Sequence, residues 1–328
     1  NCNLNEPYVL TDEAAAAAID AMADGDEKTA ALQAAREKQW KNKGVTDIYE
    51  PGSVFKVVTA SAALEEGAAT LNSSYSCKGS VMVDGWPRPI HCHNHAGHGL
   101  QTFTEAVVNS CNPAFISIGS SLGAHRFFQY FDAFGLTEKT GIDLPAEAQN
   151  SYYTEDRLNA VSLASCSFGQ SNTVTPIQMI TAASAAINGG KLLTPHVVSK
   201  ILDSDGNTVE EFGTQVRRQV ISEETSKTMS EVLEQVVSAN GGTNAYVKGY
   251  RIGGKSGTAQ KLNKEEDVYI FSYFAFAPVD DPQVACLILV DEATSGAEYA
   301  NTVVAPAVSA LMSDLLPYLG IQPQYSEE

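Results

Sequence analysis

The chain has few positive charges and no long apolar segment. Its 328 residues include 21 Lys and Arg against 39 Asp and Glu, and no basic run could neutralise a phosphate backbone. No stretch reaches the roughly 18 to 20 uninterrupted apolar residues of a membrane span, and the first residues lack a basic and apolar signal segment. We therefore expect no nucleic-acid partner, and either a soluble protein or one whose anchor is absent from this chain.

Cysteine is also scarce. The six cysteines are too few for a disulfide scaffold at this length, and they are unevenly spaced. Cys77, Cys92 and Cys111 lie within 35 residues of one another beside several histidines, which suggests a metal site. The zinc signal from spacing alone is weak because there is no C-x-x-C pair, so a disulfide between Cys77 and Cys92, or buried free thiols, stay open as alternatives.

What is present describes a globular chain, since 44% of the residues are apolar and can form a sizeable core. At this length, one large domain with an insertion competes with two domains. Periodicity and capping residues predict helices over residues 11–25, 53–67, 102–108, 113–122 and 222–239, with Thr11 and Ser222 as caps. Strands are predicted over residues 250–259, 269–277 and 283–290, and residues 71–100 are expected to be irregular. We expect an antiparallel sheet covered by helices and an all-helical lobe in the middle of the chain.

Ser53 and Lys56 stand three residues apart at a predicted helix start, where such side chains share a face. A serine hydroxyl becomes a good nucleophile when a neighbouring base takes its proton, and a lysine can do so if burial or a second cation keeps it neutral. The helix N-terminus would add partial positive charge where an oxyanion develops. Taken alone, an S-x-x-K sequence is common and usually belongs to an ordinary capped helix with a solvated lysine.

Two further short motifs carry polar groups. Residues 110–112 place the Ser110 hydroxyl and the Asn112 amide at a break between predicted helices. Residues 255–258 place Lys255 and two hydroxyls on a predicted strand. Each motif alone also fits a plain structural role, as a helix cap in the first case and as an edge strand with a solvated lysine in the second.

In this order, the three motifs form the S-x-x-K, S-x-N, K-[ST]-G signature of penicillin-binding proteins and class A β-lactamases. Further stretches are similar to class B penicillin-binding proteins: residues 49–53, 101–103, 109–113, 167–170, 175–176 and 253–260. The chain resembles that family over nearly its whole length, and most closely its Gram-positive elongation and sporulation branch.

The resemblance implies an α/β fold with a five-stranded antiparallel sheet, helices on both faces and an all-helical lobe. Residues 1–328 would form one transpeptidase domain, with an irregular zinc-binding segment at about residues 71–111. A membrane anchor and a pedestal domain would be missing from the N-terminal side. The active site would lie on the extracytoplasmic face of the bacterial membrane and serve cell-wall synthesis during sporulation or cell-shape growth, with a membrane glycosyltransferase as partner through the missing regions.

The resemblance also implies the chemistry. Ser53 would attack the penultimate D-alanine carbonyl of a peptidoglycan stem peptide ending in D-Ala-D-Ala, with Lys56 as base. An amine of a neighbouring stem would then take the acyl group from the enzyme, and β-lactam antibiotics would acylate the same serine. Ser110 would relay the proton to the leaving nitrogen, Asn112 would hold the peptide amide, and Lys255 would bias Lys56 toward its neutral form.

Substrate binding is assigned by the same resemblance to Ser256, Gly257 and Thr258. The two hydroxyls would bind the terminal carboxylate, and the backbone N–H groups of Ser53 and Thr258 would form the oxyanion hole. The middle position of this motif is often threonine in the family and is Ser256 here, so we expect altered β-lactam affinity with the function retained.

Elongation-type relatives are similar in carrying a zinc site beside the middle motif. The matching positions here are Cys77, Cys92, His98 within a Gly-His-Gly sequence, and Cys111, which could close a tetrahedral structural site. No cofactor is implied for the acyl transfer itself. Three nearby histidines would be loop residues, although one of them could replace a cysteine ligand. They are His91, His93 and His95.

Two other functions share these motifs. A serine β-lactamase needs a base that activates the deacylating water, and the sequence has no second carboxylate motif of the class A kind. A non-catalytic β-lactam sensor or scaffold would keep the fold for binding alone, which the intact Ser53, Lys56, Ser110 and Lys255 argue against.

Overall fold

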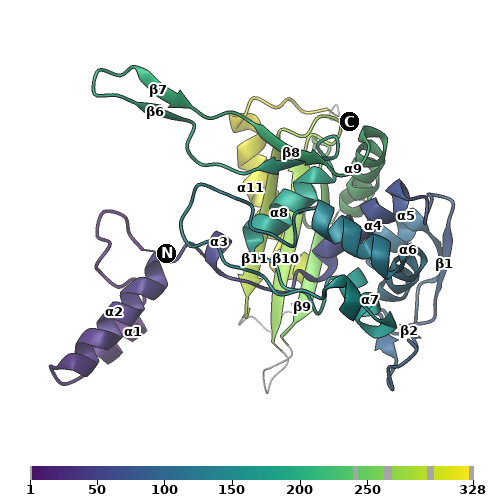
Figure 1. Ribbon diagram of the computed structural model, residues 1–328, viewed down its shortest axis with the longest axis horizontal. Coiled ribbons are helices and arrows are strands. Elements are labelled where there is room, and N and C mark those ends of the chain that lie inside the picture. The colour runs from purple at the N-terminus through teal and green to yellow at the C-terminus, as the bar shows by residue number, and fades with distance from the viewer. Residues whose placement is uncertain (1, 239–242, 262–267, 294–298, 325–328) are drawn as a thin grey trace.

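The computed structural model describes residues 2–238, 243–261, 268–293 and 299–324. At its centre lies an antiparallel sheet of three strands in the order β11-β10-β9 (Figure 1). The strands are β9 (Gly253–Gln260), β10 (Tyr269–Ala277) and β11 (Val284–Asp291). The predicted strand positions are confirmed to within three residues. The described residues supply three strands to this sheet where five were expected, and the described segment before the first motif forms helices and adds no strand to it.

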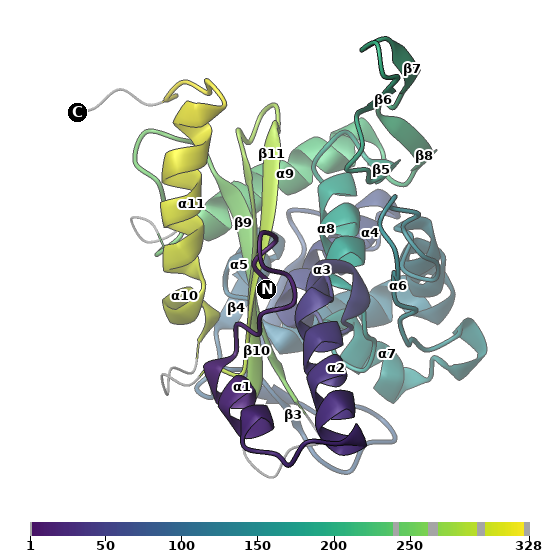
Figure 2. The same cartoon turned by 90° about the vertical axis from the view of Figure 1, so that its left-hand side faces the viewer.

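Helices cover both faces of the sheet, as expected (Figure 2). Successive side chains of a strand point to opposite faces, and β10 divides its residues accordingly. Phe274 and Phe276 pack into the core formed with α4 (Lys56–Glu65) and α8 (Pro176–Ala185). Phe271 and Tyr273 pack into the core formed with α10 (Ala300–Val303) and α11 (Ala305–Tyr318). The central strand is therefore buried on both sides.

The middle of the chain forms the expected helical lobe, built from α5 (Phe103–Val108), α6 (Asn112–Ala133) and α7 (Ala160–Ser167). Helix α6 is longer than predicted, but it contains a kink at Gly123 (φ 78°, ψ 160°), next to the predicted end at Leu122. Helix α9 (Glu223–Ser238) packs against β9 close to its predicted position, and the last predicted residue, Ala239, lies outside the described residues.

Several N-terminal expectations need correction. The first helix, α1 (Glu13–Asp20), is shorter than predicted, and it is capped by the Asp12 carboxylate, which accepts from Ala15 N, instead of by Thr11. Two helices follow that the pattern did not predict, α2 (Asp26–Trp40) and α3 (Lys43–Thr46). Helix α2 buries no residue, so it lacks the apolar stripe on which a prediction depends.

The segment expected to be irregular contains four short strands. They are β1 (Ser74–Cys77), β2 (Ser80–Val81), β3 (Ile90–His91) and β4 (Gly99–Thr102), paired as β1 with β4 and β2 with β3. Strands of two to four residues are too short to produce a detectable alternation of apolar and polar residues. The pairing of β1 with β4 brings both ends of the segment together directly before the start of α5.

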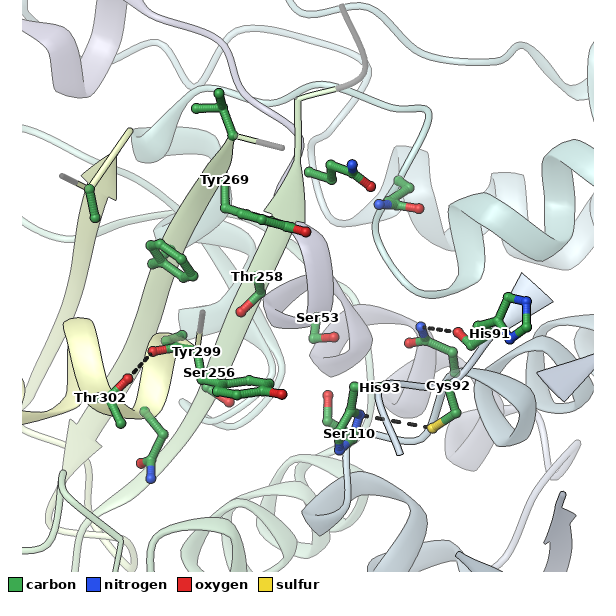
Figure 3. Close-up of a pocket in the computed structure, with 18 of the residues that line it drawn as sticks. Ser53, His91, Cys92, His93, Ser110, Ser256, Thr258, Tyr269, Tyr299 and Thr302 are labelled. Carbon is green, nitrogen blue, oxygen red and sulfur yellow. Dashed lines mark hydrogen bonds between the residues drawn. The ribbon is translucent and has the colours of Figure 1, made fainter. Parts of the chain in front are cut away.

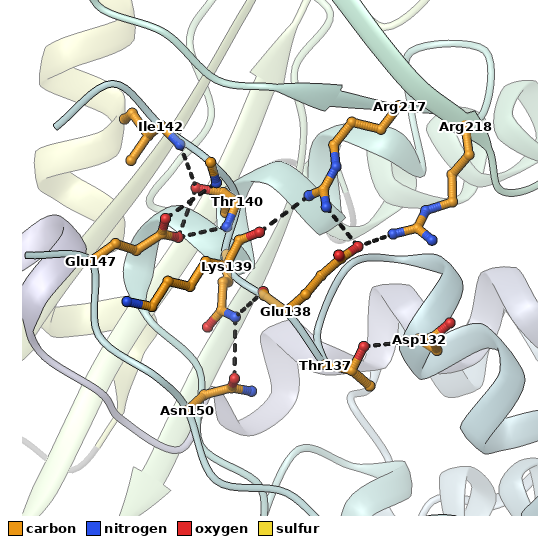
Figure 4. A network of polar contacts seen from close by, with 12 residues as sticks. Asp132, Thr137, Glu138, Lys139, Thr140, Ile142, Glu147, Asn150, Arg217 and Arg218 are labelled. Carbon is orange, nitrogen blue, oxygen red and sulfur yellow. Dashed lines mark hydrogen bonds and ion pairs between the residues drawn. The ribbon is translucent and has the colours of Figure 1, made fainter.

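A second set of strands, also not predicted, projects from the body as a long hairpin (Figure 1). Its base is β5 (Lys191–Thr194) paired with β8 (Gln215–Gln219), and its outer part is β6 (Lys200–Leu202) paired with β7 (Thr208–Glu211). At the base, the Glu138 carboxylate forms ion pairs with Arg217 and Arg218 (Figure 4). None of the described helices is both long enough and apolar enough to cross a membrane.

Candidate active site

Ser53 lies in the single turn of 3-10 helix η1 (Gly52–Phe55) directly before α4, so the predicted helix start is a tighter turn than an α-helix. This turn packs closely against β9. A Cβ on Gly52 would lie 2.8 Å from the Thr258 carbonyl oxygen, and a Cβ on Gly257 would lie 3.0 Å from the Pro51 carbonyl oxygen. The two glycines therefore allow the backbone carrying Ser53 to approach the strand of the third motif.

Lys56 is completely buried below the cleft. Its Nζ donates to the Ser110 carbonyl oxygen at 2.7 Å, to Asn112 Oδ1 at 2.8 Å and to Ser110 Oγ at 3.2 Å. The first and second motifs, 54 residues apart, thus meet at one amine. No hydrogen bond from Lys56 to the Ser53 hydroxyl occurs among the described residues, and catalytic hydrogen bonds are often formed only once substrate is bound.

Lys255 reaches the same point from the sheet. Its Nζ donates to Ser110 Oγ at 3.0 Å and to the carbonyl oxygen of Ser256 at 2.9 Å, and the residue is 1% exposed. Ser110 has a positive φ of 49°, which a serine rarely adopts. This conformation places the Ser110 hydroxyl between the amines of Lys56 and Lys255, so the strained residue is the link between all three motifs.

Both amines have lowered pKa values. Burial, and then the charge of Lys255, lower the pKa of Lys56 well below its usual value, while thiolates at Cys111 and Cys92 act in the opposite direction. Burial lowers the pKa of Lys255 to about 7. Two ammonium groups that share one hydroxyl also repel each other, which favours the loss of a proton from one of them. A lysine that acts as a base must have a neutral amine, so a lowered pKa suits that role.

The motifs open onto a cavity of about 1320 Å³ (Figure 3). Five of the predicted catalytic and substrate-binding residues line it: Ser53, Ser110, Asn112, Ser256 and Thr258. The predicted metal ligand Cys92 lines it as well. Lys56, Lys255 and Gly257 do not line the cavity; both amines contact Ser110 Oγ, and the glycine allows close packing. Figure 3 shows Ser53 between the strand that carries Ser256 and Thr258 and the loop that carries Ser110.

Other lining residues were not predicted as site residues. His91 and His93 stand on the side of the second motif, and Tyr269, Tyr299 and Thr302 stand beyond the strand (Figure 3). The His91 carbonyl oxygen accepts from Asn112 Nδ2 at 3.2 Å, which fixes the amide whose oxygen contacts Lys56. These residues come from segments without a motif, so only the fold identifies them. Gln170 also lines the cavity, and its one signal in the sequence was the family resemblance of residues 167–170.

The four predicted metal ligands lie together beside the second motif. One ligand atom from each of Cys77, Cys92, His98 and Cys111 lies within 4.8 Å of the others, and the three cysteines are buried. All six cysteines of the chain are free, so the alternative disulfide between Cys77 and Cys92 is not formed. Contact with Cys111 lowers the pKa of Cys92, and the same contact raises the pKa of Cys111. Soft sulfur donors with one imidazole suit zinc.

Two buried lysines, the Ser110 hydroxyl and the hydroxyls on β9 thus surround Ser53 at one cleft. The family described as "Penicillin binding protein transpeptidase domain" matches residues 9–313. The chain belongs to this family.

Among curated relatives, the stage V sporulation protein D of Bacillus subtilis is 43% identical over 88% of this chain and 45% of its own length. PbpB of Mycolicibacterium smegmatis is 30% identical over 78% of this chain and 41% of its own length. The chain therefore spans less than half the length of these two relatives.

The fold is also similar to solved structures of penicillin-binding proteins. The transpeptidase domain of Burkholderia pseudomallei penicillin-binding protein 3 matches with a TM-score of 0.76 at 27% identity, covering 87% of this chain and 84% of that domain. Penicillin-binding protein 3 of Mycobacterium tuberculosis complexed with aztreonam matches with a TM-score of 0.80 at 26% identity, covering 90% and 68%. The expected class B membership of the sporulation and elongation type is thereby confirmed.

Proposed function

We propose that this chain is a D,D-transpeptidase that cross-links peptidoglycan stem peptides through an acyl-enzyme on Ser53. The observation that carries the proposal is that the amines of Lys56 and Lys255 both contact the Ser110 hydroxyl. This hydroxyl and Ser53 line the same cleft. Relatives named peptidoglycan D,D-transpeptidase, such as that of Escherichia coli, support the substrate class.

In the first step, the Ser53 oxygen forms a bond to the penultimate D-alanine carbonyl as its proton passes to neutral Lys56. The tetrahedral intermediate then collapses, the peptide C–N bond breaks, and the leaving D-alanine nitrogen receives a proton. Ser110 is suited to deliver that proton, because its hydroxyl contacts both amines and faces the cleft. In the second step, an amine of a neighbouring stem attacks the ester and Ser53 recovers its proton.

The remaining groups bind and orient the substrate. The backbone N–H groups of Ser53 and Thr258 are suited to stabilise the oxyanion, since η1 and β9 pack directly together. One such donor contributes roughly 2.7 to 4 kcal/mol in a serine protease. Asn112 donates to His91 O and accepts from Lys56, so its amide is held at the cleft wall. The hydroxyls of Ser256 and Thr258 are suited to a terminal carboxylate, which β-lactams also carry.

The direct test is a reaction with a stem-peptide donor ending in D-Ala-D-Ala and an amine acceptor. We expect release of D-alanine and formation of the cross-linked peptide by the wild-type chain, and neither product with Ser53→Ala. Release of D-alanine with water alone as acceptor would indicate a carboxypeptidase. Binding of donor without any turnover would support the sensor or scaffold reading instead.

We also propose that Cys77, Cys92, His98 and Cys111 hold one structural zinc ion. The support is the donor set itself, four soft or borderline ligand atoms within 4.8 Å of one another. Bound zinc would neutralise the thiolates and tie β1 and the segment after β3 to the N-cap of α6. Since Cys111 lies between Ser110 and Asn112, the metal would order the loop that carries the second motif.

In the cell, we propose that this domain acts outside the cytoplasmic membrane as part of a longer anchored protein, together with a membrane glycosyltransferase that supplies the glycan strands. The support is its likeness to relatives of which the matched part covers less than half, one of them named for a stage of sporulation. Membrane fractionation and cross-linking of the full-length protein would test both parts.

A further inference from the structure

The loop at residues 168–172, which follows α7, forms part of the cleft wall near Ser53. Gln170 lines the cavity, and it stands between two residues with left-handed backbones, Gly169 (φ 91°) and Ser171 (φ 70°). The loop lies directly on η1: Gly52 N donates to the Gly169 carbonyl oxygen at 2.9 Å, and a Cβ on Gly169 would lie 1.9 Å from the Gly52 carbonyl oxygen. The loop is therefore in direct backbone contact with η1, the turn that carries Ser53.

Glu50 fixes the strained part of this loop. Its Oε1 accepts from Ser171 N at 3.0 Å, and the Ser171 hydroxyl donates to Ser165 Oγ at 2.9 Å. A left-handed serine is unfavourable and persists only where its surroundings hold it. On one side of this contact, Tyr49 and Val174 exchange two backbone hydrogen bonds of 2.9 Å, and on the other side lies the bond from Gly52 N to the Gly169 carbonyl oxygen. Glu50 is thus the side chain that joins two backbone contacts into one rigid unit.

Only one oxygen of the Glu50 carboxylate has a hydrogen-bond partner among the described residues. The other oxygen, Oε2, is buried. Burial raises the pKa of this carboxyl group, while the bond from Ser171 N acts in the opposite direction. An incompletely satisfied buried carboxylate is unfavourable, and such groups are found where a conformation must be fixed for function.

We infer that Glu50 is a positioning residue that holds the loop of residues 168–172 so that the Gln170 side chain contacts a peptide group of the acyl donor bound at Ser53. A primary amide both donates and accepts, which matches the peptide groups of a stem peptide. The contact is with the bound donor and not with the reacting bond. The inference rests on the proposed acyl transfer at Ser53, and it adds two residues that the three motifs do not contain.

The test is a double-mutant cycle on acylation by a chromogenic β-lactam and by a D-Ala-D-Ala donor. Gln170→Ala removes the contact and should lower the second-order acylation rate roughly 3- to 10-fold, the equivalent of about one neutral hydrogen bond. Glu50→Ala should cause a similar loss. The double variant should be no slower than the slower single variant, because both changes remove one interaction. The loss should appear in the concentration for half-maximal rate, with the limiting acylation rate nearly unchanged.

A matched control is Glu147→Ala. Glu147 also pins a loop outside the cavity lining, since its carboxylate accepts from Thr140 N at 2.7 Å and Gly141 N at 3.2 Å (Figure 4). It should lower the melting temperature without slowing acylation. If Glu50→Ala fails to fold, Glu50→Asp, which withdraws the carboxylate by one methylene, replaces it in the cycle.

Additive losses, or a Glu50 variant that loses stability like the control while acylating at the wild-type rate, would overturn the inference. Failure of the proposed function is distinguishable, because the wild-type protein would then release no D-alanine from the D-Ala-D-Ala donor and form no cross-linked product, whatever the rates of the variants.

Discussion

Two buried lysines share the hydroxyl of Ser110, and the charge of Lys255 lowers the pKa of the proposed base, Lys56. Lys56 has three hydrogen-bond acceptors, Ser110 O, Ser110 Oγ and Asn112 Oδ1, so the geometry by itself favours the charged amine. Burial and the charge of Lys255 act against it and lower the pKa of Lys56. When Lys56 takes the proton of Ser53, the acceptors are already in place to stabilise the ammonium that forms.

The pH dependence of acylation follows from this arrangement. Only neutral Lys56 can accept the Ser53 proton, so the rate should rise with pH through the pKa of Lys56 and reach its plateau well below the usual lysine value of about 10.4. Removing the neighbouring charge in Lys255→Ala should raise that pKa and move the midpoint to higher pH. Rates of acylation by a chromogenic β-lactam between pH 5 and about 10 measure both midpoints. A midpoint that does not move in the variant would contradict the role of Lys255.

Close packing between η1 and β9 can be tested at Gly257. A Cβ there would lie 2.5 Å from Ser272 Oγ and 3.0 Å from the Pro51 carbonyl oxygen, so Gly257→Ala should push the strand away from Ser53. We expect about 1 to 3 kcal/mol of lost stability from overpacking and at least roughly a tenfold slower acylation. Gly213→Ala is the control, because a Cβ there meets nothing within 4 Å. Chemical unfolding and acylation rates report the two effects, and equal behaviour of the two variants would argue against the packing account.

At the scale of elements, the sequence predicts best those segments that bury a regular face. The predicted bounds of the three strands and α9 are close to the observed ones, because β10 is apolar at every position except Ser272 and α9 buries one stripe. Helix α2 and the projecting hairpin escaped prediction for the opposite reason. Helix α2 buries nothing, and every residue of β6 and β7 is exposed, so neither has the periodicity that core packing imposes.

The segment that contains β1 to β4 has few other means of holding its shape, so it should depend on metal. Cys111→Ser keeps Ser110 and Asn112 but removes one proposed ligand, and it should lose zinc, melt at a lower temperature and acylate more slowly. Cys286→Ser, a change in β11, should retain the wild-type metal content. Elemental analysis, melting curves and acylation rates of protein purified without chelator measure this. Absence of zinc in the wild-type protein, with a Cys77 to Cys92 disulfide in peptide mapping, would refute the metal proposal.

At the scale of the whole molecule, the cleft is assembled from distant parts of the chain. Its lining includes Ser53 at the N-terminal end, Ser110 in the helical lobe and Thr302 near the C-terminus. The sequence could predict the motif residues because a recurring signature marks them. It could not predict that Ser110 adopts a positive φ, nor that Tyr299 stands opposite the loop of His93, because both depend on how the lobe and the sheet pack together.

The same view of the cleft predicts a long-lived acyl-enzyme. Among the described lining residues, the only carboxylate is Glu292, at the far end of β11, and its side chain is paired with Lys261 at 2.8 Å. None of the described residues that line the cavity therefore offers an unpaired carboxylate that could activate water at the Ser53 ester. A penicillin adduct should last for hours and survive gel electrophoresis. Rapid hydrolysis of a chromogenic cephalosporin with many turnovers per molecule would instead indicate a β-lactamase.

The central claim is that Ser53 is the acylated nucleophile, and mass spectrometry of the penicillin-treated protein tests it most directly. Intact mass should increase by one penicillin, and peptide mapping should place the adduct on Ser53, since this hydroxyl alone faces the cleft from the turn that precedes Lys56. Ser53→Ala should show no mass increase, while Lys56→Ala should be acylated far more slowly at the same serine. An adduct on Ser110, or stoichiometric labelling of Ser53→Ala, would contradict the account.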